Sequence, residues 1–207
     1  MNPLLFFKIA SVWSFRRELF YVSLAFFLAL LVPFIAVIIL TQTGIDLVSE
    51  RLATSNEKTN EVELRDPATG KIIATINSST KWPVSGTVTL EFGEIHLPYQ
   101  PLHTGIDIAN PNGRIGDSVT AFMPGKVIYA SEISWGYGKY IIIDHGNNVT
   151  SVYGHLDKIF VVKGQEITST DQVIGHEGKT GWATGPHLHF EVRVFGLPVN
   201  PRTFLQG

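Results

Sequence analysis

The sequence predicts a mostly β protein preceded by one membrane-spanning helix. From Lys81 onward the chain consists of short runs rich in Val, Ile, Thr and aromatic residues, separated by Gly, Pro and Asn. No long amphipathic helical pattern follows residue 81, whereas an uncharged apolar run extends from Leu19 to Leu40. We therefore expect an antiparallel β-sheet or an open-barrel-like domain over 81–207, with a helix before it.

The composition narrows the classes of protein. A chain of 207 residues with 44% hydrophobic content can bury one core of ordinary size. Its net charge is −2, and Lys and Arg cluster nowhere beyond Arg16 and Arg17, so we expect no nucleic-acid partner. Because the chain has no cysteine, thiolate zinc fingers and disulfide frameworks are excluded. His, Asp and Glu are the strong metal ligands that remain.

The N-terminal apolar run predicts a transmembrane helix over 19–41. Its 22 uncharged positions exceed the roughly 20 residues that one span needs. A cleaved signal peptide is the alternative, but its apolar core is normally about 7–15 residues and ends at a small-x-small site. Basic residues precede the run and acidic residues follow it closely. The positive-inside rule then places 1–18 in the cytoplasm and the rest of the chain outside the cytoplasmic membrane, as a single-pass protein.

Residues 42–80 predict an extracytoplasmic linker that contains a β-hairpin. The segment is polar at its start, and apolar residues between Val62 and Ile76 flank the turn sequence Asp66-Pro67-Ala68-Thr69-Gly70. The β-domain over 81–207 follows this linker.

Two histidine-containing clusters lie within the β-domain. In an extended strand, alternation puts His187, His189, Glu191 and Arg193 on one face, and Leu188, Phe190, Val192 and Val194 on the other. We expect the apolar face to pack into the hydrophobic core. The polar face carries metal-binding and titratable groups that a core strand does not need. Spacing alone leaves open whether one or both histidines bind a metal.

The upstream cluster is His103-Thr104-Gly105-Ile106-Asp107. On a strand, His103 and Asp107 share a side, and Gly105 leaves room between two ligands. Taken alone, the cluster also fits a surface histidine and an aspartate that begins a turn. Tyr153 and His155, at the end of another β-run, are expected to face the same way.

Taken together, the motifs form a series that resembles a known family. They occur in the order His103-x-Gly105-x-Asp107, Gly125-x-Val127, Gly136-Tyr137-Gly138, Asp144-His145-Gly146, Tyr153-x-His155-Leu156, Gly178-x-Thr180-Gly181 and Gly185-Pro186-His187-Leu188-His189-Phe190-Glu191. This series resembles the M23 family of zinc metallopeptidases, the lysostaphin-like and LytM-like endopeptidases of peptidoglycan. The resemblance covers about residues 82–202. It departs from the usual pattern between Asp107 and Val119, where this chain is a few residues longer.

The resemblance implies that His103, Asp107 and His189 bind Zn²⁺, and that His155 and His187 are the catalytic histidines beside it. Three protein ligands with an open fourth position are typical of catalytic zinc. One histidine would act as general base and the other as oxyanion donor, and the sequence leaves the assignment open. Glu191 either supports the histidines through a hydrogen bond or is a solvent-facing strand residue. Tyr153 is a candidate for lining the substrate groove or for supporting the histidines.

The sequence therefore predicts a membrane-anchored zinc endopeptidase that hydrolyses peptide cross-links of bacterial peptidoglycan. Its alternative is a non-catalytic LytM-like module that binds or activates other wall hydrolases, or docks in a membrane complex. A membrane anchor is compatible with partners in a division, secretion or conjugation complex, but the sequence does not identify them. A further alternative is an active enzyme that 42–80 inhibits by lying across the groove.

Overall fold

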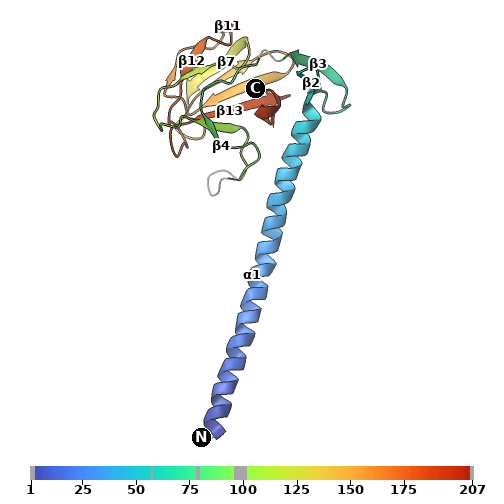
Figure 1. Cartoon of the computed structure of the whole chain (residues 1–207), viewed down its shortest axis with the longest axis vertical. Helices are drawn as coiled ribbons and strands as arrows, with labels where there is room; N and C mark the ends of the chain where they lie inside the picture. The colour runs from blue at the N-terminus through green and yellow to red at the C-terminus, as the bar shows by residue number, and fades with distance from the viewer. Residues whose placement is uncertain (1–2, 57, 78–79, 96–101, 206–207) are drawn as a thin grey trace. The chain divides into compact units, whose positions relative to one another are not determined.

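The computed structural model describes residues 3–56, 58–77, 80–95 and 102–205, with side chains from Arg17 onward except that of Asn77. Residue contacts divide the chain into two compact units, Met1–Thr43 and Gly44–Gly207. The first unit is helical and the second is mostly β (Figure 1).

Helix α1 runs from Pro3 to Leu52 and so continues past the predicted end at residue 41. Within the described residues it provides one stretch, Arg17–Leu52, that is long and apolar enough to cross a membrane, and its most apolar window of 18 residues has a mean hydropathy of 2.9. Its last turns belong to the second unit. There the Ser49 hydroxyl oxygen accepts a hydrogen bond of 2.8 Å from the Asn200 backbone N–H.

The segment in which we expected a hairpin forms a three-stranded antiparallel sheet in the order β1-β2-β3. Its strands are β1 (Ala53–Asn56), β2 (Glu61–Arg65) and β3 (Ile72–Asn77). The carboxylate of Asp66 accepts hydrogen bonds from the backbone of Ala68 and Thr69, and Gly70 adopts a φ of +70°. The turn sequence thus closes as an Asx-type turn, with glycine where a positive φ is needed.

The segment 42–80 differs from the linker that we expected. Leu52, Val62, Leu64 and Ile76 are buried and belong to the same hydrophobic core cluster as the strands after residue 81. The alternation of β2, with Val62 and Leu64 pointing inward, supplies this apolar face. The folded unit therefore begins near Gly44 rather than at Lys81.

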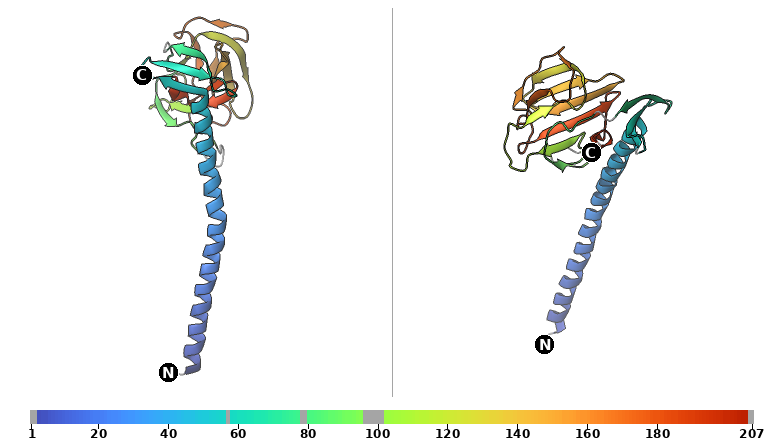
Figure 2. Two further views of the ribbon diagram at one scale, coloured as in Figure 1. Left: turned by 90° about the vertical axis from the view of Figure 1, so that its right-hand side faces the viewer. Right: turned by 45° about the horizontal axis from the view of Figure 1, so that its top comes forward.

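The main sheet has eight strands in the order β11-β7-β8-β9-β13-β5-β4, with β14 pairing β13 beside β5. Figure 2 shows several of these strands side by side. Their pairings are antiparallel and the sheet does not close, which confirms the predicted fold class. The strands are β4 (Thr87–Leu90), β5 (Ile106–Ala109), β7 (Gly125–Glu132), β8 (Lys139–Asp144), β9 (Val149–Gly154), β11 (Glu166–Ile167), β13 (Leu188–Val194) and β14 (Leu197–Val199).

A smaller antiparallel sheet has the order β10-β12-β6. It contains β6 (Ser118–Thr120), β10 (Lys158–Ile159) and β12 (Val173–His176), and a 3₁₀ helix, η1 (Pro201–Thr203), follows β14.

Strand β13 lies between β9 and β5 and carries the predicted two-faced pattern. Leu188, Phe190, Val192 and Val194 are fully buried in the core cluster, which confirms the apolar face. On the other face His189 and Glu191 are buried as well. A buried histidine next to a buried carboxylate requires specific partners, because charge and hydrogen-bonding groups are costly to remove from water.

Candidate metal centre

Strands β5 and β13 bring the two histidine-containing clusters together. Their antiparallel register pairs Asp107 directly with His189, and opposite side chains on neighbouring strands start about 4.5–5.5 Å apart. Gly105 allows this approach, since a Cβ there would collide with the carbonyl oxygen of Phe190. His103 lies just before β5, where its backbone N–H and C=O bond to Glu94 and Gly93.

The ligand atoms of His103, Asp107 and His189 form a tight triangle. His103 Nε2 and His189 Nδ1 are 3.0 Å apart, and Asp107 Oδ1 lies 3.0 Å from the first and 2.8 Å from the second. Both imidazoles are buried, whereas Asp107 is partly open to the surface. Within the described residues, these three form the group of His and acidic side chains placed to hold a metal ion.

The outward-facing nitrogens show why this triangle suits a cation. His103 Nδ1 lies 3.0 Å from the carbonyl oxygen of Glu91, and His189 Nε2 lies 3.0 Å from the carboxylate of Glu191. Because both oxygens only accept, these nitrogens carry protons, and each neutral ring turns a lone pair toward Asp107. Two lone pairs and a carboxylate oxygen require positive charge among them, and two imidazoles with one carboxylate match the preferences of Zn²⁺.

Without a metal ion, a proton supplies that charge. Burial lowers the pKa of His189, but its hydrogen bonds to Asp107 and Glu191 outweigh burial and raise the pKa to about 9. Burial likewise raises the pKa of Asp107, yet hydrogen bonds with His103 and His189 hold it well below its usual range. A metal ion must therefore displace a proton from His189 at neutral pH.

His155 and His187 lie next to the triangle, with ring centroids 4.7 Å apart. His155 Nδ1 donates to the carbonyl oxygen of Thr180 at 2.8 Å, and His187 Nδ1 donates to that of Gly185 at 2.9 Å. Because Nδ1 holds the proton in both neutral rings, each Nε2 keeps a free lone pair. His187 Nε2 is 3.5 Å from Asp107 Oδ2. Burial, followed by the charges of His189 and His187, lowers the pKa of His155 to about 3, and burial lowers the pKa of His187.

His155 adopts an unusual backbone conformation, with a φ of +61°. This left-handed conformation is uncommon for a residue with a side chain and often marks a functional position. Its backbone N–H donates to the carbonyl oxygen of Tyr137 at 2.7 Å, which holds the conformation in place. The ring is thereby directed toward His187 and His189.

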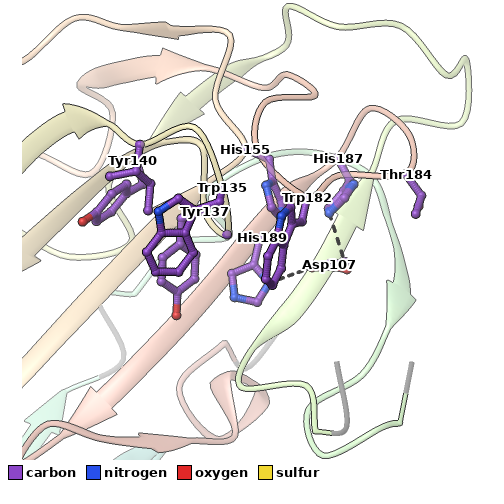
Figure 3. Close-up of a pocket in the computed structure, with 11 residues that line it drawn as sticks. Asp107, Trp135, Tyr137, Tyr140, His155, Trp182, Thr184, His187 and His189 are labelled. Carbon is purple, nitrogen blue, oxygen red and sulfur yellow. Dashed lines mark hydrogen bonds and ion pairs between the residues drawn. The ribbon is translucent and has the colours of Figure 1, made fainter. Parts of the chain in front are cut away.

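His155, His187, His189 and Asp107 open into a cavity of about 370 Å³. Figure 3 shows His155, His187 and His189 gathered near Asp107, with Tyr140 at the other end and Trp135 and Tyr137 between them. Trp135 and Trp182 are 60% and 58% exposed, and their ring centroids are 6.1 Å apart. The lining is Asp107, Ile133, Trp135, Gly136, Tyr137, Tyr140, His155, Trp182, Thr184, His187 and His189.

The structure therefore brings five predicted residues into one site and joins Glu191 to it through His189. Tyr153 does not reach the site. It is fully buried, and its hydroxyl lies 3.0 Å from both the Phe122 backbone N–H and Ser151 Oγ. Strand β9 ends at Gly154, so the alternation that would align Tyr153 with His155 does not continue.

Sequence reasoning missed the groups that hold the histidines in place. Three of them are the backbone carbonyls of Glu91, Thr180 and Gly185. Backbone oxygens leave no residue-type signal in a sequence, so spacing could not have identified them.

Comparisons with known proteins identify the family of the chain. Residues 101–201 match the family model Peptidase family M23. Mpg of Neisseria meningitidis serogroup B, a DD-carboxypeptidase/endopeptidase, is 42% identical over 100 residues, which are 48% of this chain and 22% of Mpg. NlpD of Escherichia coli K12, a murein hydrolase activator, is 38% identical over 128 residues, which are 62% of this chain and 31% of NlpD. The chain thus spans less than a third of either relative.

A solved structure gives more complete coverage. The catalytic domain of the prophage-encoded M23 protein EnpA from Enterococcus faecalis is 32% identical, with a TM-score of 0.53, and the match covers 60% of this chain and 95% of that domain. The shared sheet, the family model and the assembled histidines lead to one assignment: this chain belongs to peptidase family M23.

Proposed function

We propose that the protein is a zinc endopeptidase that hydrolyses peptide cross-links of bacterial peptidoglycan. The observation that carries the proposal is the convergence of His103, Asp107 and His189 beside a cavity that Asp107, His189 and two further histidines with free Nε2 atoms line. A purely structural metal site would be closed by a fourth protein ligand. Here Asp107 remains partly open and lines the cavity.

His103, Asp107 and His189 would hold the ion, and bound zinc would supply Lewis-acid polarisation and an acidic water. His155 and His187 present unprotonated Nε2 atoms to the cavity, so each is ready to accept a proton there. After accepting one, the same Nε2 can donate a hydrogen bond to a developing oxyanion or a proton to the leaving amine. Their lowered pKa values keep both rings neutral before the reaction at pH 7.

The cavity supports a peptide substrate with little charge near the cleaved bond. Aside from Asp107 and the histidines, its lining is aromatic, apolar or hydroxylated. No described residue of 44–77 lines the cavity, so inhibition by that segment has no support from the described part of the chain.

Helix α1 supports anchoring in the cytoplasmic membrane, with the N-terminus in the cytoplasm and the β unit outside. Because the folded unit begins near Gly44, only a few residues separate it from the apolar run. Cutting would then be confined to wall close to the membrane, as local remodelling or the opening of a path for an envelope machine requires.

A second candidate function is activation of other wall hydrolases without catalysis. Similarity to NlpD, whose name describes such an activator, favours it. The two functions differ in one measurable respect, because an activator does not cleave cross-links by itself.

The deciding experiment uses the full chain in detergent, loaded with one equivalent of zinc and incubated with purified peptidoglycan. We expect mass spectrometry to show loss of cross-linked fragments and gain of the matching monomers. His187→Ala should keep its zinc and lose at least about 100-fold in rate, and His189→Ala should lose the zinc. If zinc-loaded wild type leaves every cross-link intact but accelerates an added wall hydrolase, the activator function holds instead.

A further inference from the structure

The Glu191 carboxylate contacts His189 of the candidate metal centre and is saturated with donors. Its side chain is fully buried. Oε1 accepts from the hydroxyls of Thr104 at 2.5 Å and Tyr137 at 2.6 Å, and from His189 Nε2 at 3.0 Å. Oε2 accepts from Arg193 Nε at 2.7 Å. A carboxylate offers about four acceptor positions, so this set fills them.

The directions of these hydrogen bonds fix the tautomer of His189. Arg193 also donates through Nη2 to the Tyr137 hydroxyl oxygen at 2.9 Å, which leaves the Tyr137 proton to point at Glu191. Every other partner of Glu191 is a donor, so the carboxylate stays a pure acceptor and His189 Nε2 must donate to it. His189 Nδ1 is then left to face His103 and Asp107.

Tyr137 connects two parts of the site that are distant in sequence. Its hydroxyl reaches His189 through Glu191, and its carbonyl oxygen accepts the backbone N–H of the strained His155. Its ring lies against His189, with centroids 5.5 Å apart. Gly154 leaves room for this arrangement, because a Cβ there would lie 3.2 Å from Tyr137 Cδ1 and 3.4 Å from His189 Cβ.

We propose that Tyr137 and Arg193 are positioning residues that act through Glu191 to hold His189 Nδ1 toward the metal. This rests on the proposed role of His189 as a ligand. Outer partners of ligating histidines typically change metal affinity by about 10–100-fold when removed. The hydroxyl of Tyr137 is the sharpest probe, because its removal keeps the ring, the carbonyl and the Glu191–Arg193 ion pair.

The test compares Tyr137→Phe with Tyr153→Phe in the full chain in detergent. Tyr153→Phe is the control, since it likewise deletes one hydrogen-bonded tyrosine hydroxyl, from strand β9, without touching Glu191. Zinc affinity is measured by competition with a chelating dye, and the visible spectrum of the Co²⁺-substituted protein reports ligand geometry. We expect Tyr137→Phe to bind zinc about 10-fold more weakly, with shifted Co²⁺ bands. Tyr153→Phe should match wild type in both.

A second variant, Arg193→Lys, keeps the positive charge but cannot reproduce the two-pronged contact, so its zinc affinity should also fall. Equal zinc affinity and Co²⁺ spectra in wild type, Tyr137→Phe and Arg193→Lys would overturn the inference while leaving the proposed function intact. Equal weakening in Tyr153→Phe would overturn it too, because the effect would then be general destabilisation. If wild type itself takes up no zinc, both proposals fail together.

Discussion

Two buried glutamates show how surroundings set the charge of one residue type. Burial raises the pKa of Glu191, but hydrogen bonds and charges from His189 and Arg193 outweigh it and lower the pKa to about 2. Glu177 is equally buried, and neither of its carboxylate oxygens has a hydrogen-bond partner among the described residues. Burial, followed by the charge of Asp117 just before strand β6, raises its pKa to about 7. Glu191 therefore favours its ionised form, whereas Glu177 favours its neutral form.

This contrast predicts a pH dependence of stability that belongs to Glu177. Its pKa is about 7 in the folded chain against 4.5 for the free group, so between these values the folded state holds more proton. Stability should therefore fall as pH rises from about 4.5 to 7 and level off above. Glu177→Gln removes the charge and should stabilise residues 44–207 at pH 8 by on the order of 1–3 kcal/mol, with little gain at pH 5.

Urea unfolding of the zinc-loaded protein at both pH values checks the Glu177 prediction. Glu166→Gln is the control, because that carboxylate is exposed and its ion pair, with Lys126 at 3.5 Å, is exposed too. A gain from Glu177→Gln that is the same at pH 5 and pH 8 would show that Glu177 is not the titrating group.

At the scale of elements, strand periodicity predicted which side chains share a face wherever the strand is regular. The alternation over β13 correctly separated Leu188 and Phe190 from His189 and Glu191. The same rule misplaced Tyr153 relative to His155, because the strand ends between them and His155 turns with a positive φ. Periodicity holds only while the backbone stays extended, and functional residues concentrate where it stops. The donors around Glu191 come from three separate segments, which no single-strand pattern can bring together.

The contact between β5 and β13 leads to a prediction for Gly105. A methyl group there meets the Phe190 carbonyl and the Glu191 side chain. Gly105→Ala should therefore push the two strands apart, destabilise residues 44–207 by about 1–3 kcal/mol, and weaken zinc binding by separating Asp107 from His189. Thermal unfolding and dye competition for zinc measure the two effects.

Gly185→Ala is the matched control for Gly105, since a Cβ at Gly185 meets nothing within 4 Å and its φ is not positive. We expect it to leave stability and zinc affinity unchanged. Wild-type zinc affinity in Gly105→Ala would mean that the strand approach does not set the metal centre.

At the scale of the whole molecule, the limits of the folded unit are where sequence reasoning differed most from the structure. The short β-rich runs begin near Lys81, so the domain was expected to begin there. The structure shows that the core also takes Leu52, Val62, Leu64 and Ile76 from the preceding segment. These residues lie outside the motif series, and their polar neighbours made the segment look like a linker. Their apolar face is recognised only once the surface that it covers is known.

A pair of truncated chains tests this boundary. Residues 44–207 keep all four core residues and the Ser49 hydroxyl that accepts the Asn200 N–H, whereas residues 81–207 lose them. Each apolar side chain of this size contributes about 1.5–3 kcal/mol when buried. The free energy of unfolding of the shorter chain, measured with urea, should therefore be lower by at least about 2 kcal/mol. Because no described residue of 44–77 lines the cavity, activity per folded molecule should be equal in the two chains. A more active 81–207 would instead show that the preceding segment restrains the site. Equal stability would place the boundary of the folded unit at Lys81 after all.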